Sequence, residues 1–560
     1  MRICSFVAAL LLFAGTCSAA DYYVSAQGDD DAPGSKARPW KSIAPVNQLA
    51  ARPGDRILFE AGAIFVGNVV LNVQAPSSAT KPVIVSSYGN GRATIDGGTG
   101  TAILVQNTGG VIVENLTLRG QGRPANTGSG VRVINTLAGN VKLSFIRIRR
   151  VDAAGFGRAG IFVGGLNTDG QQSGFEDVRI ENCEVHDNTF YGILVGGPWD
   201  DDHTDTVTNG PQEGSRPGYT NKNVYIGNCR AWRNEGDPTY KRNHSGNGIV
   251  VADTDGAIIE RCTAWENGRL CLSPGGGPGG IWAAGSNRVT IQHCESFRNH
   301  TGLNTADGDG FDLDGGETNS VVQYNYSHDN DGFGFLLCNY KDAPHEWRNN
   351  VLRFNISDND GRDLKANAAI CFWTDEPELA DIEVYHNTVL VDPAANGNLP
   401  AVLCVSGKAV RARLCNNIFM ATSGCPLLDN RTDASGLRFQ GNAYWTEAGP
   451  VRLLWAGQEF ASLDAWRNST GQEILAGKPV GLFVDPLLTV YGRGMTVSDV
   501  LRLPMLPAYH LRPGSPLIGK AEDLSPLNIG KQDFFGNSLV GSGPLNIGAC
   551  ATTGTPPGKQ

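Results

Sequence analysis

Six segments of one pattern recur along the chain, and their regular spacing restricts the fold more than any other feature. Each is a short run of alternating apolar and polar residues that reaches a Cys or Asn and then a turn. They begin at residues 178, 224, 257, 289, 320 and 351 and read VRIENCEVHDN, VYIGNCRAWRN, AIIERCTAWEN, VTIQHCESFRN, SVVQYNYSHDN and VLRFNISDND. Between them lies a second series, which begins at residues 160, 192, 248, 280, 310 and 332 and reads GIFVGG, GILVGG, GIVVAD, GIWAAG, GFDLDG and GFGFLL. Two interleaved strand series with a period near 30 residues indicate coils that bury their apolar faces by stacking. The sequence therefore predicts an all-β fold, a parallel β-helix.

One position of the first series holds a small or amide side chain in every coil. Its residues are Cys183, Cys229, Cys262, Cys294, Asn325 and Asn355. Equivalent positions in successive coils lie about 4.8 Å apart in a parallel β-helix. We therefore expect the four cysteines to stack inside the solenoid and the amides to hydrogen-bond along its axis. A disulfide or metal role for these cysteines is the alternative, and regular packing at the coil spacing is the simpler interpretation.

Residues 1–20 have a basic residue, an apolar run and a small-residue end, which predicts a signal peptide.

Both ends of a solenoid must be covered, and the sequence provides for each. Residues 21–425 are assigned to the β-helix and its N-terminal cap. The cap is a short helix in which Ser42 precedes apolar residues at helical spacing, namely Ile43, Val46 and Leu49. Residues 426–560 are assigned to C-terminal coils and an irregular wrap that packs on the solenoid.

The overall charge limits the partners. The chain has 560 residues and a formal net charge of −10. An acidic protein is a poor partner for nucleic acid or for an anionic membrane surface. Beyond the N-terminal run, no stretch approaches 18 apolar residues, so we expect a secreted or periplasmic soluble protein, monomeric, without a membrane or nucleic-acid partner.

One acidic stretch stands out within the repeats. Residues 306–316 read ADGDGFDLDGG and hold four aspartates, Asp307, Asp309, Asp312 and Asp314. The alternation of Phe311 and Leu313 with acids is that of a half-buried strand, so the acids are expected on a rigid face.

Counting from the glycine that opens each strand places the acids relative to the neighbouring coils. Asp312 and Asp314 then point outward, and Asp312 follows Trp282 of one coil and precedes Gly334 of the next. The same count stacks Asp309 on Asp331 and Asp307 on Asp329. Calcium takes 6 to 8 oxygen ligands in loose geometry and would suit such a cluster. The predicted ligands are Asp307, Asp309, Asp312, Asp329 and Asp331. Polar turns, in which Asp and Gly are the usual residues, are the alternative.

Three further stretches resemble secreted right-handed β-helix proteins of polysaccharide breakdown. They are YYVSAQGDDDAPGSKARPWKSI near the N-terminus, the coil GIWAAGSNRVTIQHC, and the closing pieces SPLIG, DFFG and GA. Within that group, DGDGFDL resembles the DDGWDL motif of family 9 pectate lyases. This resemblance implies a right-handed β-helix, a calcium ion held by acids of neighbouring coils, and a lysine base. The lysine segment of that family has no clear counterpart here, which leaves the base open between Lys365 and Lys341.

We consider three functions, of which the first is the one that we predict and the other two are its alternatives. A calcium-assisted lyase would cleave a uronate-containing polysaccharide by β-elimination, with Asp312 and a lysine at the catalytic centre and Trp282 and Asp314 against the sugar. A glycoside hydrolase would use two aspartates as acid and base or nucleophile, without a metal. A glycan-binding β-helix protein would have no reaction. All three predict a polysaccharide partner.

Overall fold

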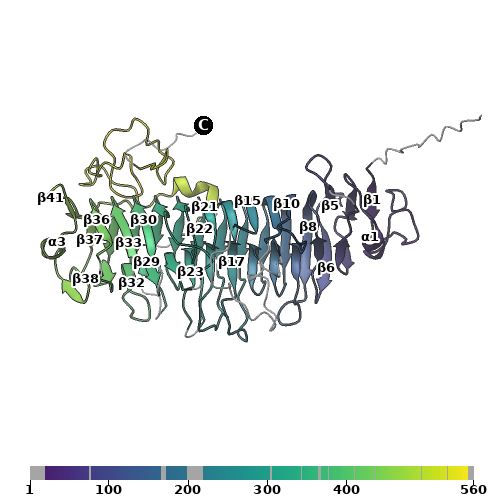
Figure 1. Cartoon of the computed structure of the whole chain (residues 1–560), viewed down its shortest axis with the longest axis horizontal. Helices are drawn as coiled ribbons and strands as arrows, with labels where there is room; N and C mark the ends of the chain where they lie inside the picture. Colours follow the sequence, from purple (N-terminus) through teal and green to yellow (C-terminus); the bar gives the residue numbers. More distant parts are fainter. Residues whose placement is uncertain are drawn as a thin grey trace, which may run out of the picture.

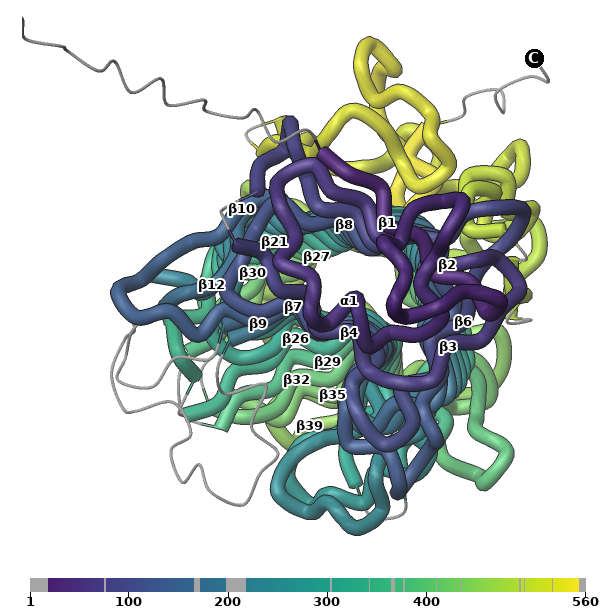
Figure 2. The backbone as a smooth tube through the Cα atoms, turned by 90° about the vertical axis from the view of Figure 1, so that its right-hand side faces the viewer, coloured from purple at the N-terminus to yellow at the C-terminus, as the bar shows by residue number. Residues whose placement is uncertain are grey.

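The computed structural model describes most of the chain as one long solenoid (Figure 1). It describes residues 19–74, 77–165, 172–197, 218–302, 305–341, 343–363, 368–375, 378–408, 410–433, 435–492, 495–497, 499–525 and 527–552. Viewed along its axis, the backbone winds round a central core as stacked coils (Figure 2). The predicted all-β parallel β-helix is confirmed. Within the described residues, no helix is long and apolar enough to span a membrane.

One face of the solenoid is a sheet of 14 described strands. In chain order they are β4 (Val69–Leu71), β7 (Ile103–Gln106), β9 (Ser129–Asn135), β11 (Ala159–Gly165), β14 (Tyr191–Gly196), β17 (Asn247–Ala252), β20 (Gly279–Ala284), β23 (Asp309–Leu313), β26 (Phe335–Asn339), β29 (Ala368–Thr374), β32 (Ala401–Gly407), β35 (Leu428–Asn430), β38 (Leu453–Trp455) and β39 (Gln458–Phe460). Each strand from β4 to β35 pairs in parallel with the strand of the next coil, and β39 pairs antiparallel with β38.

The other two faces are joined into one sheet of 26 described strands, because β8 (Val111–Gly120) and β10 (Lys142–Ala154) run across both. The second face comprises β1 (Asp21–Val24), β2 (Arg56–Glu60), β5 (Val83–Tyr88), β12 (Gly174–Glu181), β15 (Asn221–Gly227), β18 (Thr254–Glu260), β21 (Asn287–Gln292), β24 (Val321–Gln323), β27 (Val351–Arg353), β30 (Leu379–Tyr385), β33 (Val410–Cys415) and β36 (Leu437–Gln440). The third comprises β3 (Ile64–Val66), β6 (Ala93–Gly98), β13 (Glu184–His186), β16 (Arg230–Trp232), β19 (Thr263–Trp265), β22 (Glu295–Phe297), β25 (Tyr326–His328), β28 (Ile356–Asp358), β31 (Thr388–Val391), β34 (Ile418–Ala421), β37 (Ala443–Thr446) and β42 (Leu482–Phe483). A separate hairpin is formed by β40 (Ile474–Leu475) and β41 (Lys478–Pro479).

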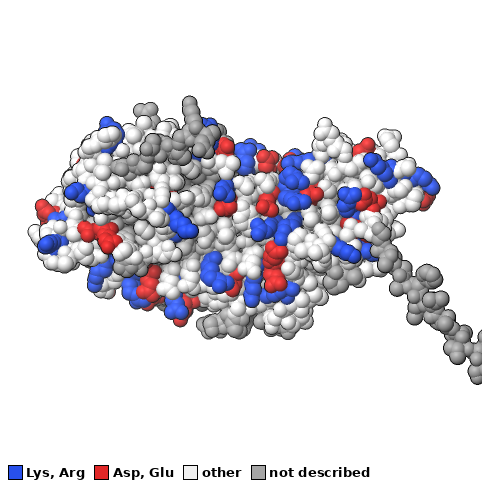
Figure 3. Space-filling view, turned by 90° about the horizontal axis from the view of Figure 1, so that it is seen from above, with Lys and Arg blue, Asp and Glu red and all other residues white. Residues whose placement is uncertain are grey.

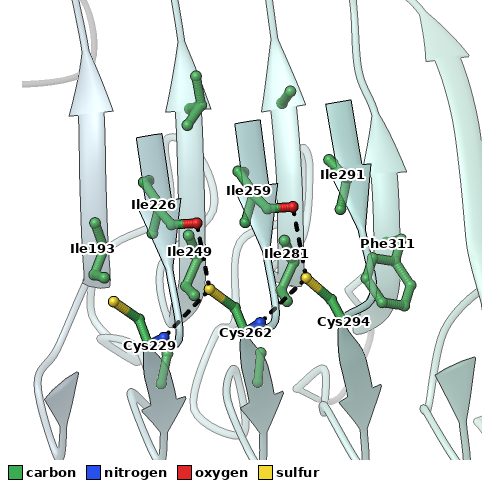
Figure 4. Close-up of a cluster of buried hydrophobic side chains, with 14 of the residues drawn as sticks. Ile193, Ile226, Cys229, Ile249, Ile259, Cys262, Ile281, Ile291, Cys294 and Phe311 are labelled. Carbon is green, nitrogen blue, oxygen red and sulfur yellow. Dashed lines mark hydrogen bonds between the residues drawn. The ribbon is translucent and has the colours of Figure 1, made fainter. Parts of the chain in front are cut away.

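The predicted column of cysteines is present and fully buried (Figure 4). The backbone N–H of Cys229 donates to Sγ of Cys262 at 3.4 Å, and that of Cys262 donates to Sγ of Cys294 at 3.4 Å. The eleven cysteines of the described residues are all free and buried, so the packing interpretation holds for this column and the disulfide alternative is wrong.

The amide part of the same column forms a hydrogen-bonded ladder. The Cys294 N–H donates to Oδ1 of Asn325 at 2.9 Å, and Nδ2 of Asn325 donates to Oδ1 of Asn355 at 3.1 Å. The ladder then continues beyond the predicted residues through Asn387, Asn417 and Asn442 to Glu473. A second buried ladder, which the sequence analysis missed, runs through Asn188, Asn234, Asn267, Asn299 and Asn330 to Asp360.

The ends of the solenoid are covered differently. At the N-terminal end, α1 (Ala44–Gln48) places Val46 in the core. The predicted helix is therefore present, but Ser42 is not its N-cap: Ile43 occupies that position without a side-chain cap bond. Near the C-terminal end, α3 (Leu463–Thr470) begins with Ser462 as its cap and buries Trp466.

The last part of the chain returns along the outside of the solenoid (Figure 1). It includes the 3₁₀ helix η1 (Val500–Met505) and packs apolar side chains on the third face. Backbone N–H groups of Val497, Glu522 and Ala549 donate to Glu295, Asn416 and Thr388 of the coils. On the face seen in Figure 3, acidic and basic side chains are interspersed rather than gathered by sign.

Candidate active site

The acidic stretch lies on β23 and the turns at its two ends. Phe311 and Leu313 point into the core, at 1% exposure each, so Asp312 between them points outward. Asp312 is in register with Trp282 of β20, as the sequence predicted. The outward face thus carries a carboxylate directly beside an aromatic residue of the preceding coil.

The register with the following coil differs from the prediction by two residues. Phe311 pairs with Phe335 and Asp312 with Leu336, so Gly334 does not follow Asp312. Gly334 instead takes the place of Gly310, because the Phe311 N–H donates to the Gly334 carbonyl at 3.0 Å. A Cβ on Gly334 would lie 2.3 Å from Oδ2 of Asp360, so this glycine is required by close packing inside the coil.

Because of this shift, Asp329 and Asp331 do not join the acids of β23. Asp331 accepts a hydrogen bond from Nδ1 of His300 at 3.0 Å, and Asp329 is paired with His328 at 3.1 Å. The predicted stacking of Asp309 on Asp331 and of Asp307 on Asp329 is therefore wrong. The structure brings together the four aspartates of the stretch itself.

Three of these four aspartates have defined hydrogen-bond donors. Asp307 accepts from the Gly277 N–H at 2.6 Å, and Asp309 accepts from the Phe333 N–H at 2.6 Å. Asp314 accepts from the N–H of the next residue at 2.7 Å and from the thiol of Cys338 at 2.6 Å.

Asp312 differs from its neighbours. Its side chain is 9% exposed, and its Oδ1 is buried with no hydrogen-bond partner in the structure. An ionised carboxylate in such a position is costly unless a proton, a cation or a ligand compensates it.

Burial and mutual repulsion raise the pKa values across this cluster. Burial raises the pKa of Asp307 to about 6. The pKa of Asp312 is raised well above its usual range, first by burial and then by the charge of Asp314. Burial also raises the pKa of Asp314, while the Cys338 thiol and the Gly315 N–H act in the opposite direction. Burial thus favours the protonated form of both acids, and Asp314 has two donors that oppose this effect.

The predicted sugar-stacking residue is largely covered. Trp282 is only 5% exposed, its Nε1 donates to Oδ1 of Asn247 at 3.1 Å, and His244 packs edge-on against its ring at 5.0 Å. Trp282 belongs to an apolar cluster on the outward face that includes Leu194 and Val250. The sequence-based expectation that Trp282 offers an open stacking surface is therefore wrong.

Of the two candidate bases, the structure describes Lys341, and the hollow that it lines includes none of the four aspartates. Lys341 follows β26 and lines a surface hollow of about 500 Å³ together with Tyr340, His345 and Glu378. The groups that act on the pKa of Asp312 are carboxylates, Asp314 first. Lys365 lies outside the described residues.

Calcium fits only part of the donor set that the structure assembles. Asp312 offers an oxygen without a partner, but two of the five predicted ligands, Asp329 and Asp331, lie elsewhere. The ligand atoms of Asp312, Asp314 and Cys338 lie within 4.8 Å of one another. A thiol is a soft donor, whereas calcium prefers oxygen.

Cys338 is the residue of this cluster that the sequence analysis missed. Leu313 pairs with Leu337, so the next position of each strand brings Asp314 beside Cys338. The correct alignment of β26 would have revealed this neighbour.

The comparisons with known proteins agree with the fold. Residues 242–389 match a family model described as the right handed beta helix region. The chain is a right-handed parallel β-helix protein. A lacto-N-biosidase of Bifidobacterium longum subsp. longum is 25% identical to it, in a match that covers 67% of this chain and 28% of that protein. This chain thus spans well under half the length of that curated relative.

Solved structures of similar fold include enzymes of two reaction classes. A GH136 lacto-N-biosidase from Eubacterium ramulus has a TM-score of 0.49 at 18% identity, covering 70% of this chain and 68% of that one. The pectate lyase Pel9A has a TM-score of 0.40 at 16% identity, covering 96% of this chain and 98% of that one.

Proposed function

We propose that this β-helix protein is a glycoside hydrolase in which Asp312 and Asp314 are the catalytic carboxylates. The observation that carries the proposal is their arrangement: Asp312 lies on β23, Asp314 comes directly after the strand on the same outward side, and one oxygen of each lies within 4.8 Å of the other. Retaining glycosidases hold their two carboxyl groups about 5–5.5 Å apart, whereas inverting enzymes need about 6.5–9.5 Å to admit water. The short separation supports a retaining reaction.

The surroundings suggest a role for each acid. Asp312 is buried and has an unpartnered oxygen, which favours the protonated form that a general acid needs. It would protonate the glycosidic oxygen of the leaving group. Asp314 is held by the Gly315 N–H and the Cys338 thiol, which favour its ionised form. It would attack the anomeric carbon to form a glycosyl-enzyme, which water activated by Asp312 then hydrolyses.

The other two acids support this pair. Asp309 is 1% exposed and holds the Phe333 N–H, so it fixes the turn that leads into the next coil. Asp307 adds negative charge that raises the pKa of Asp312 further, after burial, Asp314 and Asp309. The 25% identity to a lacto-N-biosidase over 67% of this chain supports a glycan substrate.

A calcium-assisted polysaccharide lyase is the second candidate. The gathering of four carboxylates on one strand and its turns favours it, since a cation would relieve their mutual repulsion. Asp307, Asp309 and Asp312 would then hold the ion, and Lys341 or Lys365 would supply the base. The carboxylate pair at short distance gives the hydrolase the stronger support.

Product analysis separates the two candidates. Purified protein, treated with EDTA and dialysed, is incubated with neutral and uronate-containing glycans with and without calcium. A hydrolase releases reducing ends without an unsaturated bond, and remains active without calcium. Products that absorb in the ultraviolet as unsaturated uronates, formed only with calcium, would replace the hydrolase proposal by the lyase.

Matched variants test the assignment of the two acids. Asp312→Asn and Asp314→Asn should each lower kcat at least about a thousandfold. Asp331→Asn, a change of the same chemistry at an acid paired with His300, should retain activity. Full activity in both Asp312→Asn and Asp314→Asn, with folding intact by circular dichroism, would contradict the assignment.

A further inference from the structure

A thiol completes a group of three converging ligand atoms on the outward face. Asp312 lies on β23, Asp314 follows that strand, and Cys338 lies on β26 of the next coil. One ligand atom of each, two carboxylate oxygens and a sulfur, lie within 4.8 Å of one another. Rigid neighbouring strands hold all three side chains.

Two features of this group favour the binding of a cation. Asp312 is only 9% exposed, and its Oδ1 is buried without a hydrogen-bond partner. The Cys338 thiol donates to Oδ1 of Asp314 at 2.6 Å. A cation bound by the three residues would compensate the Asp312 carboxylate and take the place of the thiol proton.

The donor types select the class of metal. Calcium and magnesium prefer oxygen ligands, whereas zinc and its softer analogue cadmium bind thiolate together with carboxylate. Zinc holds sulfur at about 2.3 Å and carboxylate oxygen at about 2.0–2.2 Å, so the Cys338 sulfur and the Asp314 oxygen, 2.6 Å apart, must separate somewhat to bind it in tetrahedral geometry. Three protein ligands leave a fourth position of a tetrahedron for water.

We propose that Asp312, Asp314 and Cys338 form a binding site for zinc or a similar thiophilic divalent ion. The metal enters as the protons of the Cys338 thiol and of the Asp312 carboxyl group leave to solvent. The site needs no assumption about catalysis. A consequence that does rest on the proposed function is inhibition, because the metal would occupy both carboxylates of the hydrolase and exclude the substrate from them.

Other cysteines of the same face provide a matched control. Cys371 is in register with Cys404 and, like Cys338, is buried on the outward side of the 14-stranded sheet. It does not belong to the group of three ligand atoms. Cys371→Ser therefore removes a similar thiol near the site without removing a ligand.

Cadmium titration tests the site directly. The full chain is reduced, stripped with EDTA and dialysed, and Cd²⁺ is added while the ultraviolet thiolate-to-cadmium charge-transfer band is recorded. We expect the band to saturate with one equivalent in the wild type and in Cys371→Ser. Cys338→Ser should lose the band, and its affinity for Zn²⁺ by calorimetry should fall at least about tenfold. A band that persists in Cys338→Ser, or is lost in Cys371→Ser, would overturn the proposal.

A second measurement needs no variant and so does not depend on how Cys338→Ser folds. Zinc X-ray absorption of the wild-type protein at one equivalent should show one sulfur ligand with the remaining ligands oxygen. Coordination by oxygen and nitrogen alone, or by two or more sulfurs, would place the metal elsewhere.

Activity tests the consequence separately. For each protein, turnover with Zn²⁺ is divided by turnover without it, so that any change in basal rate cancels. The ratio should fall for the wild type and Cys371→Ser and stay near one for Cys338→Ser. Cadmium and zinc binding without inhibition would support the site and count against the catalytic role of Asp312 and Asp314.

Discussion

Replacing Asn325 by Ala tests whether the internal ladder stabilises the solenoid. Oδ1 of Asn325 accepts the Cys294 N–H at 2.9 Å, and its Nδ2 donates to the Ile291 carbonyl at 2.8 Å. Both partners are buried, so alanine leaves a backbone donor unsatisfied and removes one donor from a carbonyl. A buried unsatisfied group costs about 1–3 kcal/mol, and a lost neutral hydrogen bond about 1 kcal/mol. We expect Asn325→Ala to destabilise the protein by about 2–4 kcal/mol.

Cysteine at the same position should be much milder. In the preceding coils, Sγ of Cys262 accepts the Cys229 N–H and Sγ of Cys294 accepts the Cys262 N–H, each at 3.4 Å. Each sulfur also lies 3.7–3.8 Å from a carbonyl of the coil before. Asn325→Cys extends that column by one residue and keeps an acceptor for Cys294. It should therefore lose less than half as much stability as alanine.

Gln323→Ala is the control, because its amide forms a similar ladder on the outer surface, where it bonds to Gln292 and Arg353. Surface changes of this kind cost about 0.5 kcal/mol or less. Urea unfolding followed by far-ultraviolet circular dichroism measures all three variants. If Asn325→Ala is no less stable than Gln323→Ala, or Asn325→Cys no more stable than Asn325→Ala, the hydrogen-bond reasoning is wrong.

Three further outcomes are expected. Gly334→Ala should lower the thermal midpoint, since its Cβ would meet Oδ2 of Asp360 at 2.3 Å, and an unchanged midpoint would contradict the register described above. Burial lowers the pKa of His328, but hydrogen bonds to Asp329 and Glu295 outweigh this and raise it to about 9, so the contribution of His328 to stability is complete below about pH 6.5 and is lost as the pH rises through 9. The thermal midpoint of His328→Asn should therefore decline less over this pH interval than that of the wild type, and an equal decline would refute this assignment. Lys341→Ala should keep kcat within about twofold if the hydrolase proposal holds, whereas a loss comparable to that of Asp312→Asn would favour a lysine base.

The repeat predicted the fold because its spacing is nearly constant. Coils of 30 to 33 residues, from Cys229 to Asn355, align without gaps in the first strand series, and that alignment located the buried column. The second ladder, which starts at Asn188, was missed because its residues lie in the turns, where Asn is also the usual surface residue.

The site was predicted less well, because side chains along a strand alternate between its two faces with a period of two residues. The coil GFGF has glycines at 332 and 334, two residues apart, and a shift of two leaves every side chain on the same face. Alternation therefore cannot choose between them. The hydrogen bond from Phe311 to Gly334 selects the second glycine, which moves Asp329 and Asp331 away from the acids and brings Cys338 to Asp314.

The burial of Trp282 could not be predicted from the sequence, for a different reason. Whether an outward side chain meets solvent depends on the loops of other coils. His244 and Asn247, which cover the indole, come from the preceding coil and precede it by 38 and 35 residues. Such contacts leave no periodic signal.

The position of Asp312 in its column supports the proposed role as a general acid. Its neighbours along the axis are Trp282 on one side and Leu336 on the other, both at 5% exposure. An apolar column excludes water from the carboxylate, and the charge of Asp314 opposes its ionisation further. In the proposed reaction Asp312 gives its proton to the glycosidic oxygen, while Asp314, just beyond the end of the strand, has two donors that oppose the rise of its pKa by burial. The proposed roles differ because one aspartate lies inside the apolar column and the other lies where the strand ends.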